Sequence, residues 1–282
     1  MLPNAGVLGE LDKPAQNDAE TYIRVWETFG PVLKEGLYED FERRPSLLGL
    51  ARFKTTASGS GWHSLKDYVG SFRETQTAIY YMTGTDLTRL EASPQLEGFR
   101  ARGIEVLLLP DPVDNFWVTA GIEYDGKLLK SVTQGAADLT KIPLIEAHEI
   151  VDAPATEAVI GFIKSVKAAL GNSVADVRAS ERLTESAVCL VAPETGMDRQ
   201  LERLLARTGQ LGAAAKPVLE INPRHDLIAA LANLGDTEQT LREDAAHLLL
   251  DEARIMDGEL PEDAKAFSQR LARVMQRCVP NG

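Results

Sequence analysis

The stretch FRARGIEVLLLPDPVDNFWV, residues 99–118, constrains the fold of this chain more than any other part of it. Its centre, IEVLLL, is apolar at five of six positions, which predicts a strand buried on both faces, as in the middle of a parallel sheet. Ser93-Pro94 is typical of a helix start and Gly103 of a left-handed helix end, so a helix precedes this strand. TAIYYMTG, residues 77–84, predicts an earlier strand. The order strand–helix–strand predicts an α/β domain, a small sandwich of helices around a short, largely parallel sheet.

Length, charge and the N-terminal residues limit the class of protein. A chain of 282 residues is long for one hydrophobic core and predicts two domains. A net charge of −12 opposes contact with phosphate backbones and anionic lipid, so we expect neither nucleic acid nor membrane partners. The start MLPNAGVLGELDK has neither the basic nor the apolar region of a signal peptide, so we expect a cytoplasmic protein.

Capping residues place two helices in the first domain. Asn17 or Asp18 is expected to cap a helix in NDAETYIRVWETFGPVLKEG, and the Gly-Pro pair at 30–31 is expected to interrupt it. Ser64 with Asp67 forms a capping box at the start of SLKDYVGSF. The expected apolar stripe of the first helix consists of Tyr22, Val25, Trp26 and Phe29.

The composition changes after residue 135. Residues 135–158 mix Pro, Asp, Glu and Ala without periodicity and predict a linker at about 135–155, which gives domains 1–140 and 141–282. The second domain is expected to be α+β. It has a helix closed by Gly171, strands in VADVRAS, AVCLVA and KPVLEINP, a helix in TGMDRQLERLLARTG and three C-terminal helices, the first of them started by Asn222-Pro223.

Two aspartates could carry chemistry in the loop after the buried strand. Asp111 and Asp114 could form an acid–base pair, but a turn with Asp114 as N-cap of a helix from Asn115 explains them better. An α/β enzyme or small-molecule-binding module using this pair stays open as the alternative. Cys189 and Cys278 lie in apolar patterns typical of reduced, packed thiols, and no histidine has ligand spacing, so no metal site is expected.

Two apolar features suit recognition of other polypeptides better than catalysis. Phe116 and Trp117 are adjacent, and adjacent helical side chains point about 100° apart, so one core can hardly take both. The helix in TGMDRQLERLLARTG, with a Thr195–Asp198 capping box, has a second apolar stripe. Periodicity favours packing of this stripe on the neighbouring sheet, whereas its methionine suits an open binding surface. The stripe consists of Met197, Leu201, Leu204 and Leu205.

The last two helices carry a large apolar surface. Pairing with a second copy into a four-helix bundle and burial within the chain's own domain are equally natural explanations. The heptad-like seam of the last helix consists of Phe267, Leu271, Val274 and Cys278. The row on the helix before it consists of Leu241, Ala245 and Leu248, widened by Leu249.

Taken together, these segments resemble the heat-shock protein 90 chaperone family in its bacterial HtpG branch. The similarity covers nearly the whole chain in order. It is carried by YIRVWETFGPVLKEGLYEDFERRPSLLGLARF, TAIYYMTG, SPQLEGFRARGIEVLLLPDPVDNFWV, EYDGKLLKSVTQG and LEINPRHDLI. The resemblance implies the distal part of a middle domain followed by a C-terminal dimerisation domain that ends in a helical bundle. The family's N-terminal ATP-binding domain and the arginine that reaches the ATP phosphate would be absent, so ATP and magnesium would bind outside this chain and the fragment would not be an enzyme.

The resemblance also implies partners and site residues. Non-native client proteins would contact Phe116, Trp117, Met197, Leu201, Leu204 and Leu205. A second copy would contact Leu241, Ala245, Leu248, Leu249, Phe267, Leu271, Val274 and Cys278. The bacterial heat-shock protein 70 system would be a further partner in the stress response. Besides the chaperone fragment and the enzyme or small-molecule-binding module, a third interpretation is a purely structural dimerisation module without client affinity.

Overall fold

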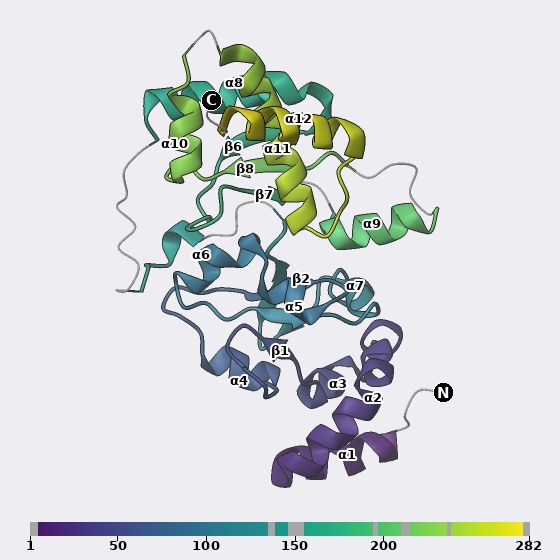
Figure 1. Cartoon of the computed structure of the whole chain (residues 1–282). Helices are drawn as coiled ribbons and strands as arrows, with labels where there is room; N and C mark the ends of the chain where they lie inside the picture. The colour runs from purple at the N-terminus through teal and green to yellow at the C-terminus, as the bar shows by residue number, and fades with distance from the viewer. Residues whose placement is uncertain are drawn as a thin grey trace. The chain divides into compact units, whose positions relative to one another are not determined.

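The computed structural model describes residues 5–134, 139–145, 155–193, 197–209, 215–235 and 238–278, in two compact units (Figure 1). Unit 1 comprises Met1–Ala92 and Gly103–Val132, and unit 2 comprises Ser93–Arg102 and Thr133–Gly282. Each unit has its own small mixed sheet and its own helices, so the expected mixed α/β class is confirmed. The domain boundaries expected from the sequence stay predictions. Within the described ranges, no helix is long and apolar enough to cross a membrane.

The sheet of unit 1 has five strands in the order β1-β3-β2-β5-β4. Its central strand β2 runs parallel to β3 and β5, and both edge strands pair antiparallel to their neighbours. The sheet is therefore mixed rather than largely parallel, because its edges are short antiparallel strands. The strands are β1 Lys54–Thr55, β2 Ile79–Thr83, β3 Leu107–Leu109, β4 Glu123–Tyr124 and β5 Lys127–Ser131.

The hairpin β4–β5 is an element that the sequence analysis did not predict. It turns at Asp125 and Gly126, with φ of 50° and 66°. An Asp-Gly pair in this conformation suits the tight turn of a two-residue hairpin. The Asp-Gly pair is the feature of the sequence from which the hairpin could have been predicted.

The helices of unit 1 confirm the expected caps. Asp18 accepts a hydrogen bond from the Thr21 backbone N–H, and Ser64 with Asp67 forms the capping box. Gly103 has the left-handed φ expected of it, 62°, but the preceding helix, α6 (Glu97–Arg100), already ends with Ala101 as its C-cap. The helices are α1 Ala5–Asn17, α2 Ala19–Glu39, α3 Arg44–Leu50, α4 Leu65–Gly70, α5 Leu87–Glu91 and α7 Asp114–Trp117.

Helix α2 passes through the Gly-Pro pair at 30–31, so the expected interruption is wrong. Gly30 lies against the Trp26 ring, where an added Cβ would come within 3.0 Å of the ring, so a bulkier residue would disturb this packing. Phe29 is 56% exposed and does not belong to the buried row. The row that packs into the core continues along the helix as Tyr22, Trp26, Leu33 and Leu37. Burial of these side chains outweighs the hydrogen bond lost at proline.

Unit 2 is built on a three-stranded sheet in the order β6-β8-β7. Strand β8 pairs parallel with β6 and antiparallel with β7, for example Leu219 opposite Val177 and Leu190. The strands are β6 Asp176–Ala179, β7 Val188–Val191 and β8 Val218–Ile221, as the three apolar segments predicted. The main helices are α6 Glu97–Arg100, α8 Glu157–Leu170, α9 Arg199–Arg207, α10 Asp226–Ala232, α11 Gln239–Met256 and α12 Ala264–Cys278. The short 3-10 turns are η1 Pro94–Leu96, η2 Leu139–Lys141 and η3 Gly171–Ser173.

Of two helix boundaries predicted in unit 2, one is confirmed and the other is wrong. Helix α8 ends at Gly171 as expected, with a φ of 49°. Helix α10 does not begin at Asn222-Pro223, because Asn222 Oδ1 accepts a hydrogen bond from the Arg224 N–H and closes a local turn. His225 Nδ1 accepts from the Leu227 N–H and caps the helix instead.

The segment 93–102 packs entirely within unit 2, although the chain on both sides of it belongs to unit 1. The Glu97 carboxylate accepts hydrogen bonds from the backbone N–H groups of Thr184, Glu185 and Ser186. An added Cβ at Gly98 would lie 2.8 Å from the Arg182 Cα, so this position requires glycine. These contacts fix the segment to the loop between β6 and β7.

The expected linker is only partly described. Residues 139–145 belong to unit 2, where Arg102 Nε donates to the carbonyls of Leu139 and Ile142 at 2.7 and 3.0 Å. Residues 135–138 and 146–154 lie outside the described residues, and the interpretation of this stretch as a linker stays a prediction.

Candidate interaction surfaces

A buried charge cluster holds α7 against α2 in unit 1. Lys34 Nζ donates to Asp111 Oδ2 and to Asp114 Oδ2, each at 2.9 Å, and its side chain is 4% exposed. Asp114 is fully buried and also accepts from Trp117 Nε1 at 2.7 Å and from the Asp111 backbone N–H at 3.2 Å. The cluster therefore joins the end of the apolar strand β3 to a helix that lies about 80 residues earlier in the chain.

This cluster corrects the expected position of Asp114 and explains its burial. Asp114 does not cap α7 from outside but begins the helix, with Val113 at the N-cap position. Burial raises the pKa of Asp114, whereas Lys34 and the Trp117 hydrogen bond oppose that rise. The enclosed carboxylate of Asp114, with every described contact inside the protein, fits a structural role better than acid–base chemistry, whereas Asp111 is 33% exposed. Lys34 could not be predicted as their partner, because nothing local in the sequence links it to the aspartates.

The two adjacent aromatic side chains differ in burial, as their adjacent positions on a helix predict. Trp117 is fully buried beside Phe53, with ring centroids 6.0 Å apart. Phe116 is 36% exposed and lies against Tyr38, also at 6.0 Å. Trp117 is therefore a core residue and offers no surface to a client, which corrects that expectation. Contact of Phe116 with a client stays a prediction.

Helix α9 of unit 2 begins later than expected. Asp198 is its N-cap and accepts from the backbone N–H groups of Gln200 and Leu201. It is therefore not the third residue of a capping box, and Thr195 lies outside the described residues. Met197 precedes the helix and is 40% exposed.

The charged side of α9 is the side that is buried, against the expectation from periodicity. Arg199 donates to Asp257 Oδ2 from Nε and Nη2, at 3.0 and 2.8 Å, and to Glu259 at 3.0 Å. Arg203 pairs with the same two carboxylates. Asp198 accepts from the Thr133 hydroxyl at 2.6 Å. The helix thus docks onto the end of α11 and the residues after it largely through charge.

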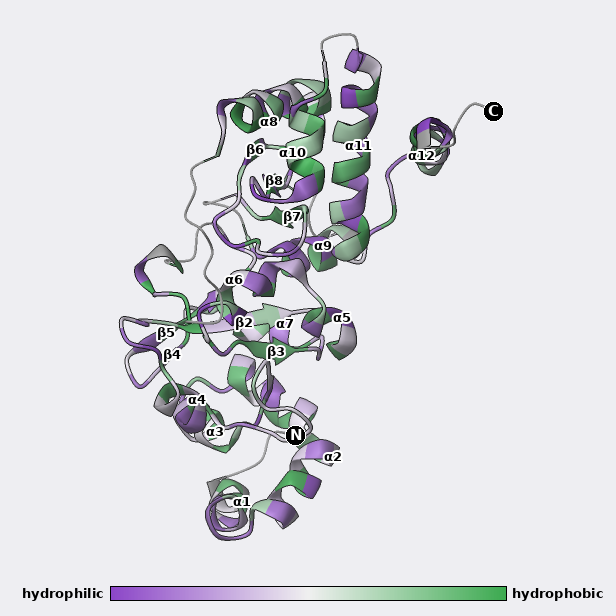
Figure 2. Ribbon diagram, turned by 60° about the vertical axis from the view of Figure 1, so that its left-hand side comes forward, coloured by the Kyte–Doolittle hydropathy of each residue, from purple (hydrophilic) through white to green (hydrophobic). Residues whose placement is uncertain are grey.

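The leucines of α9 differ in burial. Leu201 is 7% exposed and faces the interior, so it is not part of an open surface. Leu204 and Leu205 are partly exposed, and with Met197 they form the accessible apolar part of this region. We call Met197, Leu204 and Leu205 the α9 surface. Figure 2 shows α9 and its hydropathy beside the end of α11.

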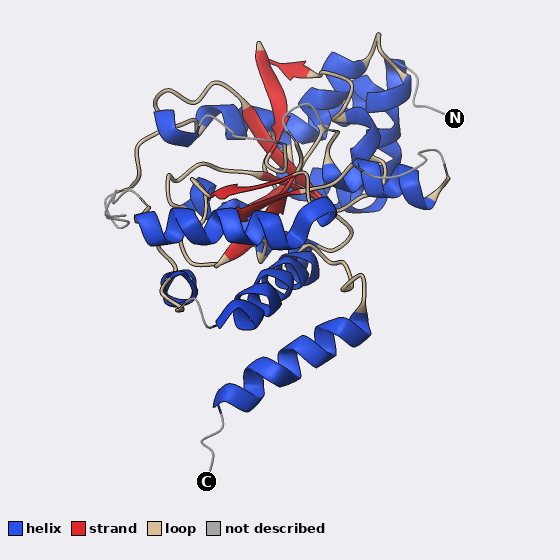
Figure 3. Ribbon diagram, turned by 90° about the horizontal axis from the view of Figure 1, so that it is seen from above, coloured by secondary structure: helices blue, strands red, loops and turns tan. Residues whose placement is uncertain are grey.

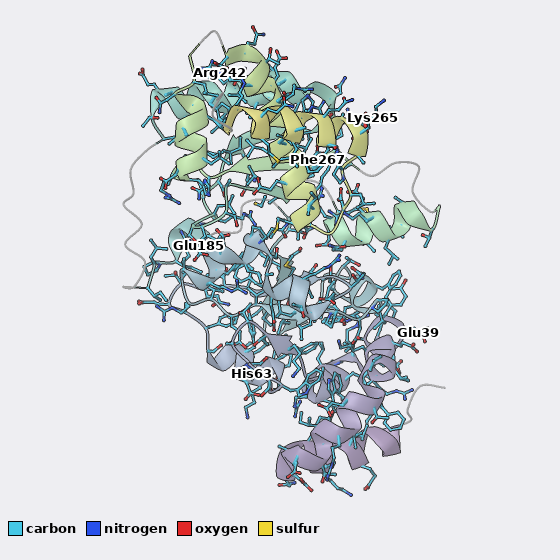
Figure 4. The ribbon with its side chains drawn as sticks, in the orientation of Figure 1. Glu39, His63, Glu185, Arg242, Lys265 and Phe267 are labelled. Carbon is cyan, nitrogen blue, oxygen red and sulfur yellow. The ribbon has the colours of Figure 1, made fainter. Side chains whose placement is uncertain are left out.

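The C-terminal helices α11 and α12 differ in how far the chain itself covers them. Leu249 of α11 is buried in the core of unit 2 and Ala245 is 7% exposed, so neither presents an open surface, whereas Leu241 and Leu248 are partly exposed. No described side chain of α12 is buried, and Leu271 is 39% exposed. Phe267 and Val274 are partly exposed, and the side chain of Cys278 lies outside the described residues. Figure 3 shows α12 outside α11, and Figure 4 labels Lys265 and Phe267 near its start.

Ion pairs hold α12 to α11. Arg273 donates to both oxygens of Asp244 at 2.7 and 2.6 Å, and Arg277 pairs with Glu238. The Arg273 hydrogen bonds hold the pKa of Asp244 below its ordinary value. Polar contacts therefore orient α12 and leave its apolar seam, Phe267, Leu271 and Val274, without deep burial. We call these three residues the α12 seam.

Of the two cysteines, the structure describes the side chain of Cys189. Cys189 is a buried free thiol, and burial raises its pKa far above the ordinary value. Among the described side chains, no group of three His, Cys, Asp or Glu residues could hold a metal ion.

Comparison with known proteins identifies the family. Residues 7–281 match the family model described as Hsp90 protein. A "Chaperone protein HtpG" of Mesorhizobium japonicum is 62% identical over 98% of this chain, and one of Azorhizobium caulinodans is 65% identical over 97%. A third, of Nitrobacter winogradskyi, is 55% identical over 96% of the chain. The chain covers only 44%, 44% and 42% of these relatives, respectively, so it spans less than half of their length. With nearly all of its residues matched by the family model, this chain belongs to the Hsp90 family.

Proposed function

We propose that this chain supplies the client-binding surface and the homodimer contact of an HtpG-type molecular chaperone. The observation that carries the proposal is that α9 docks through the ion pairs of Arg199 and Arg203 and leaves Leu204 and Leu205 partly exposed. A helix docked by its charged side keeps apolar side chains available to non-native polypeptides. Methionine and leucine adapt to many partners, which suits broad and weak binding.

The proposed parts are the distal middle domain, in unit 1, and the C-terminal dimerisation domain, in unit 2. Support comes from the order of the matching segments and from relatives that are more than twice as long as this chain. ATP hydrolysis by the whole protein, with its magnesium, would then lie outside these 282 residues. A heat-shock protein 70 partner and a cytoplasmic location belong to the same proposal. Calorimetric titration of this chain with ATP and magnesium tests the nucleotide part, which heat of specific binding would contradict.

Suppression of client aggregation tests the α9 surface. The chain should lower light scattering from a thermally aggregating protein, and Leu205→Asp should weaken this protection because it places charge in the apolar surface. Leu227→Asp on α10 is the matched control, since Leu227 is 43% exposed in the same unit. Equal loss in both variants, or no loss in Leu205→Asp, would contradict the proposed surface.

Sedimentation equilibrium tests the α12 seam. Two copies that pair their seams would form a closed twofold bundle and cover the residues that α11 leaves uncovered. We expect a dimer for the unaltered chain and a monomer for Leu271→Asp. Leu260→Asp, at a position that is 86% exposed before α12, should stay dimeric. An unaltered chain that is monomeric at high concentration would reject the dimer.

A further inference from the structure

A second apolar surface lies in unit 1, at the C-terminal end of α2. Tyr38 in the last turn is 49% exposed, Phe41 just after the helix is 68% exposed, and Phe116 of α7 is 36% exposed. Tyr38 and Phe116 are in ring contact, with centroids 6.0 Å apart. We call Tyr38, Phe41 and Phe116 the aromatic cluster. Aromatic side chains gathered on a surface mark sites of recognition more often than chance.

The rim of the aromatic cluster is acidic. Glu35 and Glu39 lie one turn apart on α2, and Glu42 follows Phe41 directly. All three are exposed, and none of their carboxylates has a hydrogen bond or ion pair within the part of the chain that the structure describes. Figure 4 labels Glu39 at the end of α2. Three exposed carboxylates without a described cation therefore lie within three residues of Tyr38 or Phe41 along the chain.

The local basic residues are already engaged. Lys34 is buried between Asp111 and Asp114, and Arg43 pairs with Asp40 at 3.0 Å. Arg44 lies over the Phe41 ring, with its guanidinium carbon 4.3 Å from the ring centroid, and donates from Nε to the Leu37 carbonyl. The contact of Arg44 with Phe41 is a cation–π interaction within the chain, and it leaves the Tyr38 and Phe116 rings without such a cation among the described contacts.

The support beneath the cluster is rigid. Asp114 fixes α7 to α2 through Lys34, and Trp117, the next residue after Phe116, is locked in the core. Phe116 therefore presents its ring from a fixed position, so binding would not require ordering of the helix that carries it.

We propose that the aromatic cluster and its acidic rim bind a cationic amphipathic segment, in which lysine or arginine alternates with apolar side chains. Lysine or arginine would meet Glu35, Glu39 and Glu42, and the apolar side chains would cover Tyr38, Phe41 and Phe116. Charge complementarity selects this occupant over an acidic segment, which the rim would repel. The inference rests on the proposed function, because it names the class of client segment and places its contact in unit 1, apart from the α9 surface.

Fluorescence anisotropy with a labelled 12-residue peptide of alternating lysine and leucine tests the surface on the full chain. We expect saturable binding that weakens with added salt, and no binding of the same peptide with glutamate in place of lysine. The double variant Tyr38→Ser/Phe41→Ser should weaken binding about tenfold. Glu35→Gln/Glu39→Gln, which keeps the shape of the side chains, should weaken binding at low salt and reduce its salt dependence.

Phe29→Ser is the matched control, because Phe29 is 56% exposed on the same helix. It lies nine residues before Tyr38, about two and a half helical turns, and so on the opposite side of α2. Equal weakening by Phe29→Ser, or equal binding of the lysine and glutamate peptides, would overturn the proposal.

The outcome separates this inference from the proposed function. Loss of client protection in Leu205→Asp without peptide binding in unit 1 would reject the cationic-segment site alone. Peptide binding that depends on Tyr38 and Phe41, with client protection unaffected by Leu205→Asp, would reject the α9 surface and leave this site standing.

Discussion

Helices α7 and α9 are both short, both carry an apolar side chain expected to meet other proteins, and both are fixed by buried ion pairs. They differ in how much apolar surface is buried beside the ion pairs. In α7 the cluster of Lys34, Asp111 and Asp114 lies against the core, and Trp117 fills that core completely. In α9, Arg199 and Arg203 meet Asp257 and Glu259 at the edge of unit 2.

The amount of apolar burial therefore separates the two helices. Removal of a large core side chain typically costs about 3–5 kcal/mol, so Trp117 alone secures α7. Helix α9 has one deeply buried leucine, Leu201, and depends on charge for the rest of its attachment. We infer that α7 is a fixed part of unit 1, whereas α9 can be released from unit 2 by changes that act on charge alone.

The largest effect should follow from Lys34→Met. This variant leaves Asp114 buried without its cation, and loss of one partner of a buried pair costs about 3–5 kcal/mol. All three tryptophans lie in unit 1, so intrinsic fluorescence during urea unfolding reports this unit. Lys66→Met, at an exposed position on α4, should leave the unfolding midpoint in place. A Lys34→Met chain as stable as the unaltered one would show that the cluster does not secure α7.

The next effect should follow from Asp257→Asn, which removes the carboxylate that both arginines of α9 contact. We expect the attachment of α9 to weaken by about 1–3 kcal/mol, because its guanidinium groups lose a charged acceptor. Hydrogen exchange should rise in α9 and stay slow in β7 and β8. Faster exchange throughout unit 2 would contradict local release, and unchanged exchange in α9 would contradict docking by charge.

Added salt should weaken the attachment of α9 more than that of α7 without any substitution. The screening length falls from about 10 Å at 0.1 M to about 3 Å at 1 M salt, and partly exposed pairs are screened more than enclosed ones. Glu259 is 28% exposed, whereas Asp114 is fully buried. Hydrogen exchange in α9 should therefore rise with sodium chloride while exchange in α7 stays unchanged. A parallel rise in both helices would remove the distinction.

The smallest effect concerns the pair that orients α12. Hydrogen bonds from Arg273 lower the pKa of Asp244 below 3.8, so the folded state binds this proton less tightly than the unfolded chain does. The contribution of the pair to stability is therefore present above pH 4 or so and is lost as the pH falls through the lowered pKa. Amide hydrogen exchange in α12 should therefore rise in that acidic range. The rise should be smaller in Asp244→Asn, because this variant lacks the titrating group. The effect should be small because Arg273 is half-exposed to water.

Local signals in the sequence predicted the features that depend on neighbouring residues. The caps at Asp18, Ser64 and Gly171 involve backbone groups within a few positions, so the sequence contains all of their partners. The adjacent pair at 116–117 showed that only one aromatic ring could be buried. It could not show which, because Phe53 and Asp114 select Trp117 through tertiary contacts.

The features that sequence reasoning missed depend on residues far apart in the chain. Lys34 meets Asp114 across 80 positions, and no local pattern reveals that contact. Arg199 meets Asp257 across 58 positions, which turned the apparent solvent side of α9 inward. Proline at 31 would end a helix on propensity alone. Helix α2 continues past it because buried side chains on both sides of the proline, Trp26 and Leu33, pack into the core.

The ten residues 93–102 have a consequence for how this molecule can be divided. Because they complete unit 2 while interrupting unit 1 in sequence, no single cut yields both halves whole. A fragment that starts at residue 133 would lose Glu97, leaving the amides at 184–186 to water, and would expose the site where Gln95 donates to the Leu190 carbonyl. Separate expression of the second half therefore calls for a grafted peptide or a circular permutation rather than a truncation.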